Sequence, residues 1–129
     1  MKNAKHLKVF DAKTGQGLKA LKSFTAGEEL IEYLGPRIHS DEANENPNPY
    51  LFGLNEDYCI DGSSLSNLAR YINHSCTPNA QAVLSHDELS ITIEAIKPIE
   101  VGDEILIDYG EEYFEAYIAP IGCKCSKCD

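Results

Sequence analysis

The chain has 129 residues and a formal net charge of −10, from 21 acidic and 11 basic side chains. This length suits one domain with a real core and is too short for two. The acidic charge argues against direct nucleic-acid binding and favours a basic protein partner, although such charge also simply keeps small proteins soluble. No apolar run could span a membrane or act as a signal peptide, so we expect an intracellular protein with no membrane association. Self-association as a homodimer stays open.

Most of the chain is expected to form short strands, because short apolar runs alternate with turn residues. The expected strands are residues 7–10, 17–22, 29–34, 50–54, 80–84, 89–95 and 104–109. Residues 90–94 alternate most clearly, which predicts a half-buried strand, and residues 85–88 predict a hairpin connection. Such short segments predict a mainly β fold and exclude a doubly wound sheet.

Three further segments are predicted to form a loop or helices instead of strands. Residues 40–49, rich in acidic residues and Asn with two prolines, predict a surface loop. Short helices are expected over residues 65–71 and 111–118.

A Gly-x-Gly pair, Gly15 and Gly17 around Gln16, lies near the N-terminus. Alone it indicates only a tight turn, since glycine readily adopts positive φ. It lacks the third glycine and the following helix of a dinucleotide-binding motif. It does allow backbone groups to approach a small zwitterionic ligand closely.

The segment Arg-Tyr-Ile-Asn-His-Ser-Cys-Thr-Pro-Asn, residues 70–79, is the clearest candidate site. Its side chains have little to offer an apolar core. Arg70, Asn73, His74 and Cys76 instead supply donors, acceptors and a thiol that could bind a polar ligand.

Three cysteines, Cys123, Cys125 and Cys128, lie within six residues near the C-terminus. In an intracellular protein this spacing favours a metal-bound thiolate cluster over disulfides, with free thiols as the alternative. Structural zinc takes four ligands in a tetrahedral array. Cys76, among turn residues, is the expected fourth ligand, whereas Cys59 has the apolar setting of a core residue.

Taken together, these motifs resemble the SET-domain protein lysine methyltransferases. The resemblance is carried, in family order, by Gly15-x-Gly17, Glu32-Tyr33-x-Gly35, residues 67–79, residues 102–110 and the cysteine tail. It implies a SET-domain fold of several small curled sheets and short helices, with a knot-like crossing near the C-terminus. The SET domain would cover residues 6–118, and a post-SET zinc-binding tail would cover residues 119–129. The tail has two residues between its last cysteines, where many members have four.

The resemblance also implies a role for individual residues. S-adenosylmethionine would be bound by Gly15, Gln16, Gly17, Arg70, Asn73, His74, Tyr109 and Phe114. Tyr109 would be the catalytic residue, and the substrate lysine channel would be lined by Tyr50, Ile107 and Tyr113. Packing in the core is the alternative for Tyr50 and Tyr113, and it is the expected role of Tyr33. Zinc would be held by Cys76, Cys123, Cys125 and Cys128.

The implied activity is methyl transfer from S-adenosylmethionine to a lysine of a basic protein, such as a histone or a histone-like protein, with S-adenosylhomocysteine as the product. The family often has an aromatic residue two positions before the catalytic tyrosine. Here that residue is Ile107, which predicts di- or trimethylation. The alternative function is a catalytically inactive, zinc-stabilised SET-like module that binds a basic partner. The complete cofactor set favours the enzyme, since a pure binder would not need it.

Overall fold

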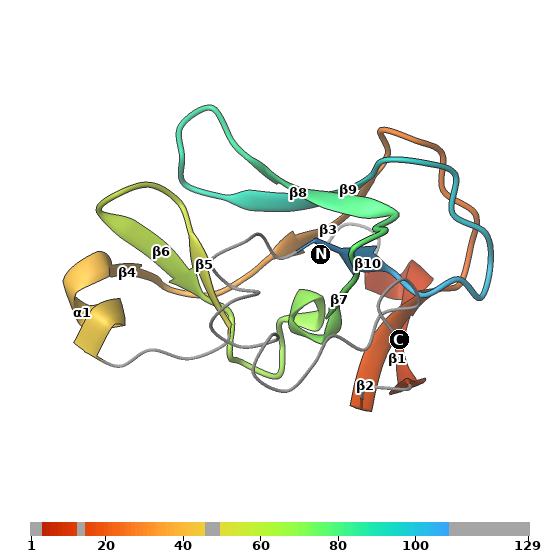
Figure 1. Ribbon diagram of the computed structural model, residues 1–129, viewed down its shortest axis with the longest axis horizontal. Helices are drawn as coiled ribbons and strands as arrows, with labels where there is room; N and C mark the ends of the chain where they lie inside the picture. Colours follow the sequence, from red (N-terminus) through yellow and green to blue (C-terminus); the bar gives the residue numbers. More distant parts are fainter. Residues whose placement is uncertain (1–3, 13–14, 46–49, 109–129) are drawn as a thin grey trace.

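The computed structural model describes residues 4–12, 15–45 and 50–108, and the description below concerns these residues. They form a mainly β structure with four small sheets and three short helical segments (Figure 1). This architecture confirms the predicted fold class. None of the helices in the described ranges is long and apolar enough to span a membrane.

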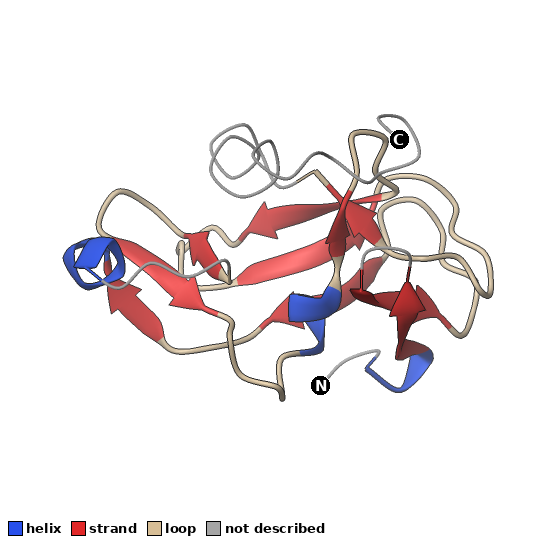
Figure 2. Cartoon of the chain, turned by 60° about the horizontal axis from the view of Figure 1, so that its bottom comes forward, coloured by secondary structure: helices blue, strands red, loops and turns tan. Residues whose placement is uncertain are grey.

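The elements lie in the order η1 (Ala4–His6), β1 (Leu7–Ala12), β2 (Gly15–Ala20), β3 (Glu29–Tyr33), β4 (Arg37–His39), α1 (Ser40–Glu45), β5 (Leu51–Gly53), β6 (Tyr58–Asp61), η2 (Leu68–Tyr71), β7 (Asn73–His74), β8 (Ala80–Leu84), β9 (Ile91–Ala95) and β10 (Leu106–Ile107). Strands β1 and β2 form an antiparallel hairpin, and β7 pairs with β10 in parallel. Two three-stranded antiparallel sheets have the orders β3-β9-β8 and β4-β6-β5. The β4-β6-β5 sheet and α1 lie at one end of the molecule and the β1–β2 hairpin at the other (Figures 1 and 2).

The predicted strands match observed strands in position, but the structure adds three that the sequence did not predict. These are β4, β6 and β7, all of four residues or fewer. Each pairs with a segment elsewhere in the chain, and none has a long apolar pattern that the sequence could reveal. The predicted hairpin is confirmed, since Ser85 N–H donates to Ser90 O at 2.9 Å between β8 and β9.

Two predicted segments differ in the structure. The loop expected over residues 40–49 is wrong in its first part, where α1 forms. Asp41 and Glu42 in the first turn favour a helix N-terminus, and Asp41 N–H donates to His39 Nδ1 at 3.1 Å. The helix expected over residues 65–71 is only the 3-10 turn η2. The helix predicted over residues 111–118 lies outside the described residues.

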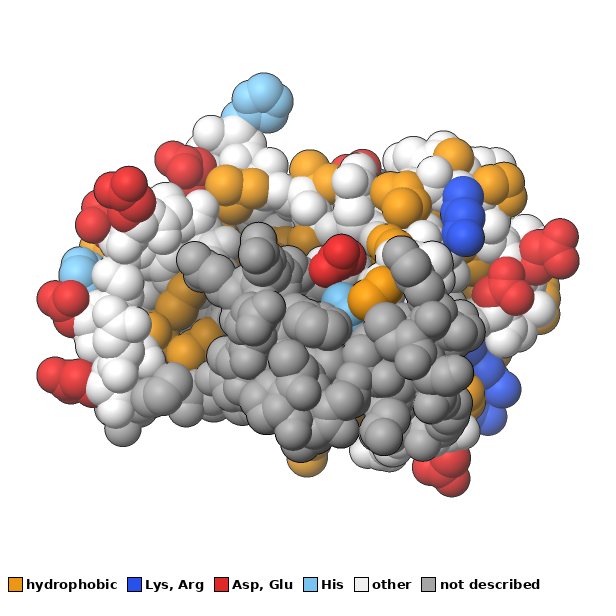
Figure 3. Space-filling model, in the orientation of Figure 1, with side chains coloured by type: hydrophobic (Ala, Val, Ile, Leu, Met, Phe, Trp, Pro, Cys, Tyr) orange, Lys and Arg blue, Asp and Glu red, His pale blue; other side chains and the backbone are white. Residues whose placement is uncertain are grey.

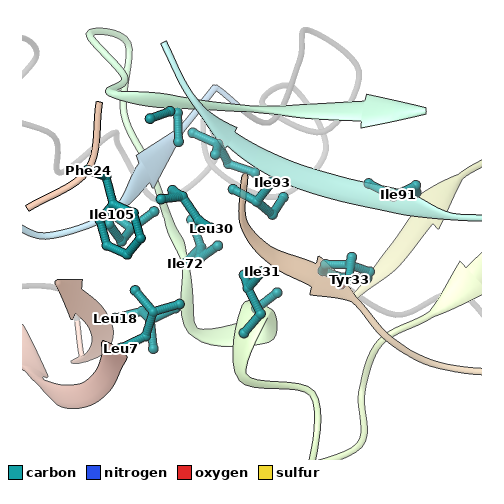
Figure 4. Packing of buried hydrophobic residues seen from close by; sticks show 14 of the residues in the cluster. Leu7, Leu18, Phe24, Leu30, Ile31, Tyr33, Ile72, Ile91, Ile93 and Ile105 are labelled. Carbon is teal, nitrogen blue, oxygen red and sulfur yellow. The ribbon is translucent and has the colours of Figure 1, made fainter. Parts of the chain in front are cut away.

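The core sits between the β3-β9-β8 sheet and the segments around β2, η2 and β10 (Figure 4). In β9 Ile91, Ile93 and Ala95 are buried and the two residues between them are partly exposed, which confirms the predicted alternation. Each fully buried isoleucine side chain contributes roughly 1.5–3 kcal/mol. The same core includes Ile72 and Ile107, so it fixes the two segments that carry the predicted site.

Asn67 is a fully buried polar residue that joins the core to the start of the site. Its Oδ1 accepts from Leu34 N–H at 3.0 Å and its Nδ2 donates to Gly62 O at 3.0 Å. Tyr33 is only 6% exposed and packs beside Gly62 and Asn67. Its hydroxyl donates a hydrogen bond to Tyr50 O at 2.7 Å. Tyr33 is therefore a packing residue, as the sequence predicted.

Candidate active site

The polar block identified in the sequence lies beside the strand that leads to Tyr109. In the parallel pair of β7 and β10, Asn73 is opposite Leu106 and His74 is opposite Ile107. Ser75 N–H extends the pairing by donating to Ile107 O at 2.9 Å. This pairing joins the two segments that the resemblance places at the crossing. Tyr109 itself lies outside the described residues.

Asn79 fastens the two segments together through both its backbone and its side chain. Its backbone N–H donates to Leu106 O at 3.1 Å, and its Oδ1 accepts from Leu106 N–H at 2.9 Å. Its Nδ2 donates to Glu104 O at 2.8 Å. Buried backbone groups need such partners, so Asn79 replaces the ladder bonds that a longer sheet would supply.

Asn73 connects this crossing to the Gly-x-Gly strand. Its Nδ2 donates to Gln16 O at 3.1 Å and to Glu104 Oε2 at 2.9 Å. A Cβ added at Gly17 would lie only 2.5 Å from the same Glu104 oxygen. The structure therefore brings Gln16, Gly17 and Asn73 together, three of the predicted cofactor-binding residues.

The side chain of His74 is buried between Asp108 and Cys76. Its side chain is 5% exposed, and its Nδ1 lies 3.8 Å from Asp108 Oδ1. Its Nε2 lies 3.5 Å from Cys76 Sγ. The imidazole thus lies between the residue before Tyr109 and the predicted zinc ligand of the polar block. Its pairing with Asp108 becomes ionic when the ring is protonated.

Arg70 lies over aromatic rings. Its Cζ is 4.3 Å from the ring centroid of Tyr50 and 5.4 Å from that of Tyr71, within the range of cation–π attraction. Its Nη1 donates to Ser63 O. Its Nε is buried and has no hydrogen-bond partner among the described residues. The structure thus places Arg70, a predicted cofactor residue, beside Tyr50, a predicted channel residue.

The predicted metal site is only partly described. Cys76 is half-buried at the crossing, whereas Cys123, Cys125 and Cys128 lie outside the described residues, as do Tyr113 and Phe114. In the described ranges, no group of three or more His, Cys, Asp and Glu side chains is placed to hold a metal ion.

Cys59 is buried in β6, as the sequence predicted. Burial raises the pKa of its thiol, and the nearby carboxylates of Asp61 and Glu42 raise it further. A thiol held protonated in this way is a poor metal ligand, because metals bind the thiolate.

Sequence reasoning missed Glu104 as part of the site. In the sequence it is one acidic residue among several after Gly102, and only its position within the Gly-Asp-Glu motif offered a signal. Its contact with Asn73 depends on the approach of β7 to the segment before β10, which the sequence does not show.

Residues 15–110 match the family model of the SET domain. Mouse histone-lysine N-methyltransferase EHMT1 is 34% identical over 127 residues, which cover 88% of this chain and 10% of that protein. Drosophila melanogaster histone-lysine N-methyltransferase Set2 is 34% identical over 128 residues, which cover 87% of this chain and 6% of that protein.

A solved structure gives the same result for the fold. It is ctPRC2, from Chaetomium thermophilum, in an autoinhibited conformation bound to S-adenosylmethionine. It superposes with a TM-score of 0.72 at 32% identity, over 81% of this chain and 15% of that chain. The chain therefore spans only a small part of the length of these relatives. The match of fold, motif order and sequence shows that the chain belongs to the SET-domain family.

Proposed function

We propose that this domain is a protein-lysine N-methyltransferase that transfers methyl groups from S-adenosylmethionine to a lysine of a basic protein. The observation that carries the proposal is the meeting of the Gly-x-Gly strand with β7 and β10 through Asn73. The relatives support it, because they are histone-lysine N-methyltransferases and a similar structure is bound to S-adenosylmethionine.

The residues present fit this cofactor. When bound, S-adenosylmethionine supplies an electrophilic methyl group on a positively charged sulfur. Gly15 has a φ of +119°, and among the described residues only its chain neighbours could lie within 4 Å of an added Cβ, so the backbone of β2 can approach a ligand closely. We propose that Gly15, Gln16 and Gly17 bind the amino-acid portion of the cofactor. Arg70, Asn73, His74, Tyr109 and Phe114 complete the proposed set.

Methyl transfer mainly requires alignment of the substrate amine, which must approach to ~3 Å from the methyl group. The amine must also be neutral, which costs roughly 4 kcal/mol near pH 7 for a lysine with a reference pKa of ~10.4. We propose that Tyr50, Ile107 and Tyr113 line an apolar channel that disfavours the ammonium form. The fixed guanidinium of Arg70 against the ring of Tyr50 adds to this effect. In this arrangement, the Tyr109 hydroxyl orients the neutral amine.

We further propose a structural zinc ion held by Cys76, Cys123, Cys125 and Cys128 in a tail formed by residues 119–129. The position of Cys76 beside the His74 side chain supports this role. Cys76 lies where β7 and β10 pair and not in the hydrophobic core. The metal would attach the tail to the crossing and take no part in the chemistry.

A basic substrate of the histone or histone-like class fits the charge of the chain. The net charge is −10, and the exposed acidic residues Asp41, Glu42 and Glu45 lie on α1. Acidic side chains gather over the α1 end of the molecule in Figure 3. Such a surface attracts lysine-rich segments and repels nucleic acid. An intracellular location goes with this substrate class.

The direct test is transfer of radiolabelled methyl groups onto core histones and a panel of other basic proteins, with the modified lysine identified by mass spectrometry. Calorimetric titration of the zinc-loaded protein with S-adenosylmethionine separates the two functions considered above. Binding and transfer are expected. A protein that binds basic peptides but not S-adenosylmethionine would be the inactive module instead.

A further inference from the structure

The carboxylate of Glu104 occupies the space over the second glycine of the Gly-x-Gly pair. A Cβ at Gly17 would lie 2.5 Å from Glu104 Oε2, whereas Phe10 Cε1 and Ala12 Cβ would be at 3.0 and 3.1 Å. The closest obstacle to a side chain at this position is therefore the carboxylate. The absence of a side chain at Gly17 therefore leaves room for the Glu104 carboxylate.

The same carboxylate oxygen holds Asn73. A primary amide nitrogen has two hydrogens to donate, and Asn73 Nδ2 has two acceptors inside the protein. These acceptors are Glu104 Oε2 at 2.9 Å and Gln16 O at 3.1 Å. The Asn73 side chain thus links the Gly-x-Gly strand to the segment before β10.

The backbone around Glu104 is held on both sides. Asn79 Nδ2 donates to Glu104 O at 2.8 Å, and Ile105 N–H donates to Leu18 O at 2.8 Å. Lys19 and Glu104 form an isolated antiparallel bridge. The carboxylate therefore projects toward Asn73 from a fixed backbone position, and bonds to an ionised acceptor are stronger than neutral ones.

We propose that Glu104 is a positioning residue of the cofactor site. Its carboxylate holds the Asn73 amide against Gln16 O and so fixes the Gly-x-Gly strand relative to β7. In this arrangement, Gly17 is needed because any side chain there would displace the carboxylate. The inference rests on the proposed function, because it assumes that these segments bind S-adenosylmethionine.

The test is a double-mutant cycle on the dissociation constant for S-adenosylmethionine, measured by calorimetry with the zinc-loaded full chain. Glu104→Ala and Asn73→Ala are each expected to weaken binding by about tenfold, as for loss of a hydrogen bond to a charged group. The double variant should bind no more weakly than the weaker single variant. Additive losses would overturn the proposal, because the carboxylate would then act on the cofactor independently of Asn73. An unchanged affinity of Glu104→Ala would also overturn it.

Two conservative variants separate the reach of the side chain from its charge. Glu104→Gln keeps an acceptor oxygen at the same reach, so its affinity should stay within about threefold of the unmodified protein. Glu104→Asp keeps the charge but is one methylene shorter, so it should weaken binding like Glu104→Ala. The reverse order would show that the charge acts directly on the positive cofactor and would overturn the proposal. This pair decides the matter even if Glu104→Ala does not fold.

The matched control is Glu100→Ala, which removes an exposed carboxylate from the preceding turn and should leave the affinity unchanged.

Gly17→Ala should weaken binding in the unmodified chain and much less in the Glu104→Ala background, because the displaced group is then absent. Equal effects in both backgrounds would contradict the role given to Gly17. If the unmodified chain binds no S-adenosylmethionine, the proposed function fails. If the unmodified chain binds S-adenosylmethionine and substitution of Glu104 leaves the dissociation constant unchanged, only this inference fails.

Discussion

His74 Nδ1 lies 3.8 Å from Asp108 Oδ1, with the imidazole 5% exposed and the carboxylate 57% exposed. Asp108 directly precedes Tyr109, and His74 also contacts Cys76 Sγ at 3.5 Å. One buried ring therefore joins the approach to the proposed catalytic residue and a proposed zinc ligand. Loss of the metal should consequently disturb the alignment of Tyr109 as well as the tail.

Tyr109→Phe should reduce methyl transfer by about a hundredfold or more, because the amine loses the hydroxyl that orients it. The fold and the zinc content should not change, since the ring is kept. Radiolabelled transfer measures the activity, while circular dichroism and metal analysis provide the controls. Near-normal turnover would remove the role proposed for the hydroxyl.

One zinc ion per chain is expected, held by Cys76 and the three cysteines of the tail. Cys76→Ala should lose the metal because a tetrahedral structural site needs all four ligands. Cys59→Ala is the matched control and should keep it, since Cys59 is buried in β6. Elemental analysis of the two purified variants decides the matter. Zinc retained in Cys76→Ala and lost in Cys59→Ala would identify Cys59 as the fourth ligand.

The product should carry two or three methyl groups. Ile107 is 3% exposed and has no hydroxyl that could hold a water molecule or restrain a methylated amine. A monomethylated lysine should then be able to rotate and react again. Mass spectra of a reaction run to saturation with excess cofactor measure the outcome. A product that stops at one methyl group would show that another wall residue, such as Tyr50, sets the limit.

Gly35→Ala should destabilise the fold by about 1–3 kcal/mol, as overpacking does elsewhere. A Cβ at Gly35 would lie 1.9 Å from the backbone oxygen of Asp61, and backbone cannot move aside as a flexible side chain can. Gly53→Ala is the control, because no atom of the described residues other than its chain neighbours lies within 4 Å of its added Cβ. Urea unfolding of both variants gives the comparison. Equal stability would mean that the bend at Gly35, between β3 and β4, can move away from Asp61 of β6 at little cost.

The sequence by itself determined the β character of the chain and the position of its longer strands. Alternation of apolar residues over β9 and turn residues at 85–88 are local signals, so the hairpin of β8 and β9 was predictable. It also identified the residues of the candidate site, because an Asn-His-Ser-Cys block and clustered cysteines have a chemistry that needs no coordinates to be recognised. The roles of Tyr109 and of the cysteine tail stay predictions.

Only the tertiary structure decided which of these residues meet. Strands β4, β6 and β7 are too short to have a pattern of their own, and they form because distant segments pair with them. Asn67 and Glu104 are ordinary polar residues in the sequence. Burial gives Asn67 its bonds to Leu34 and Gly62, and the approach of β2 to β7 gives Glu104 its contact with Asn73. The periodicity of apolar residues indicates which side of a strand or helix faces the core. The contacts of Asn67 and Glu104 depend instead on how segments distant in sequence cross.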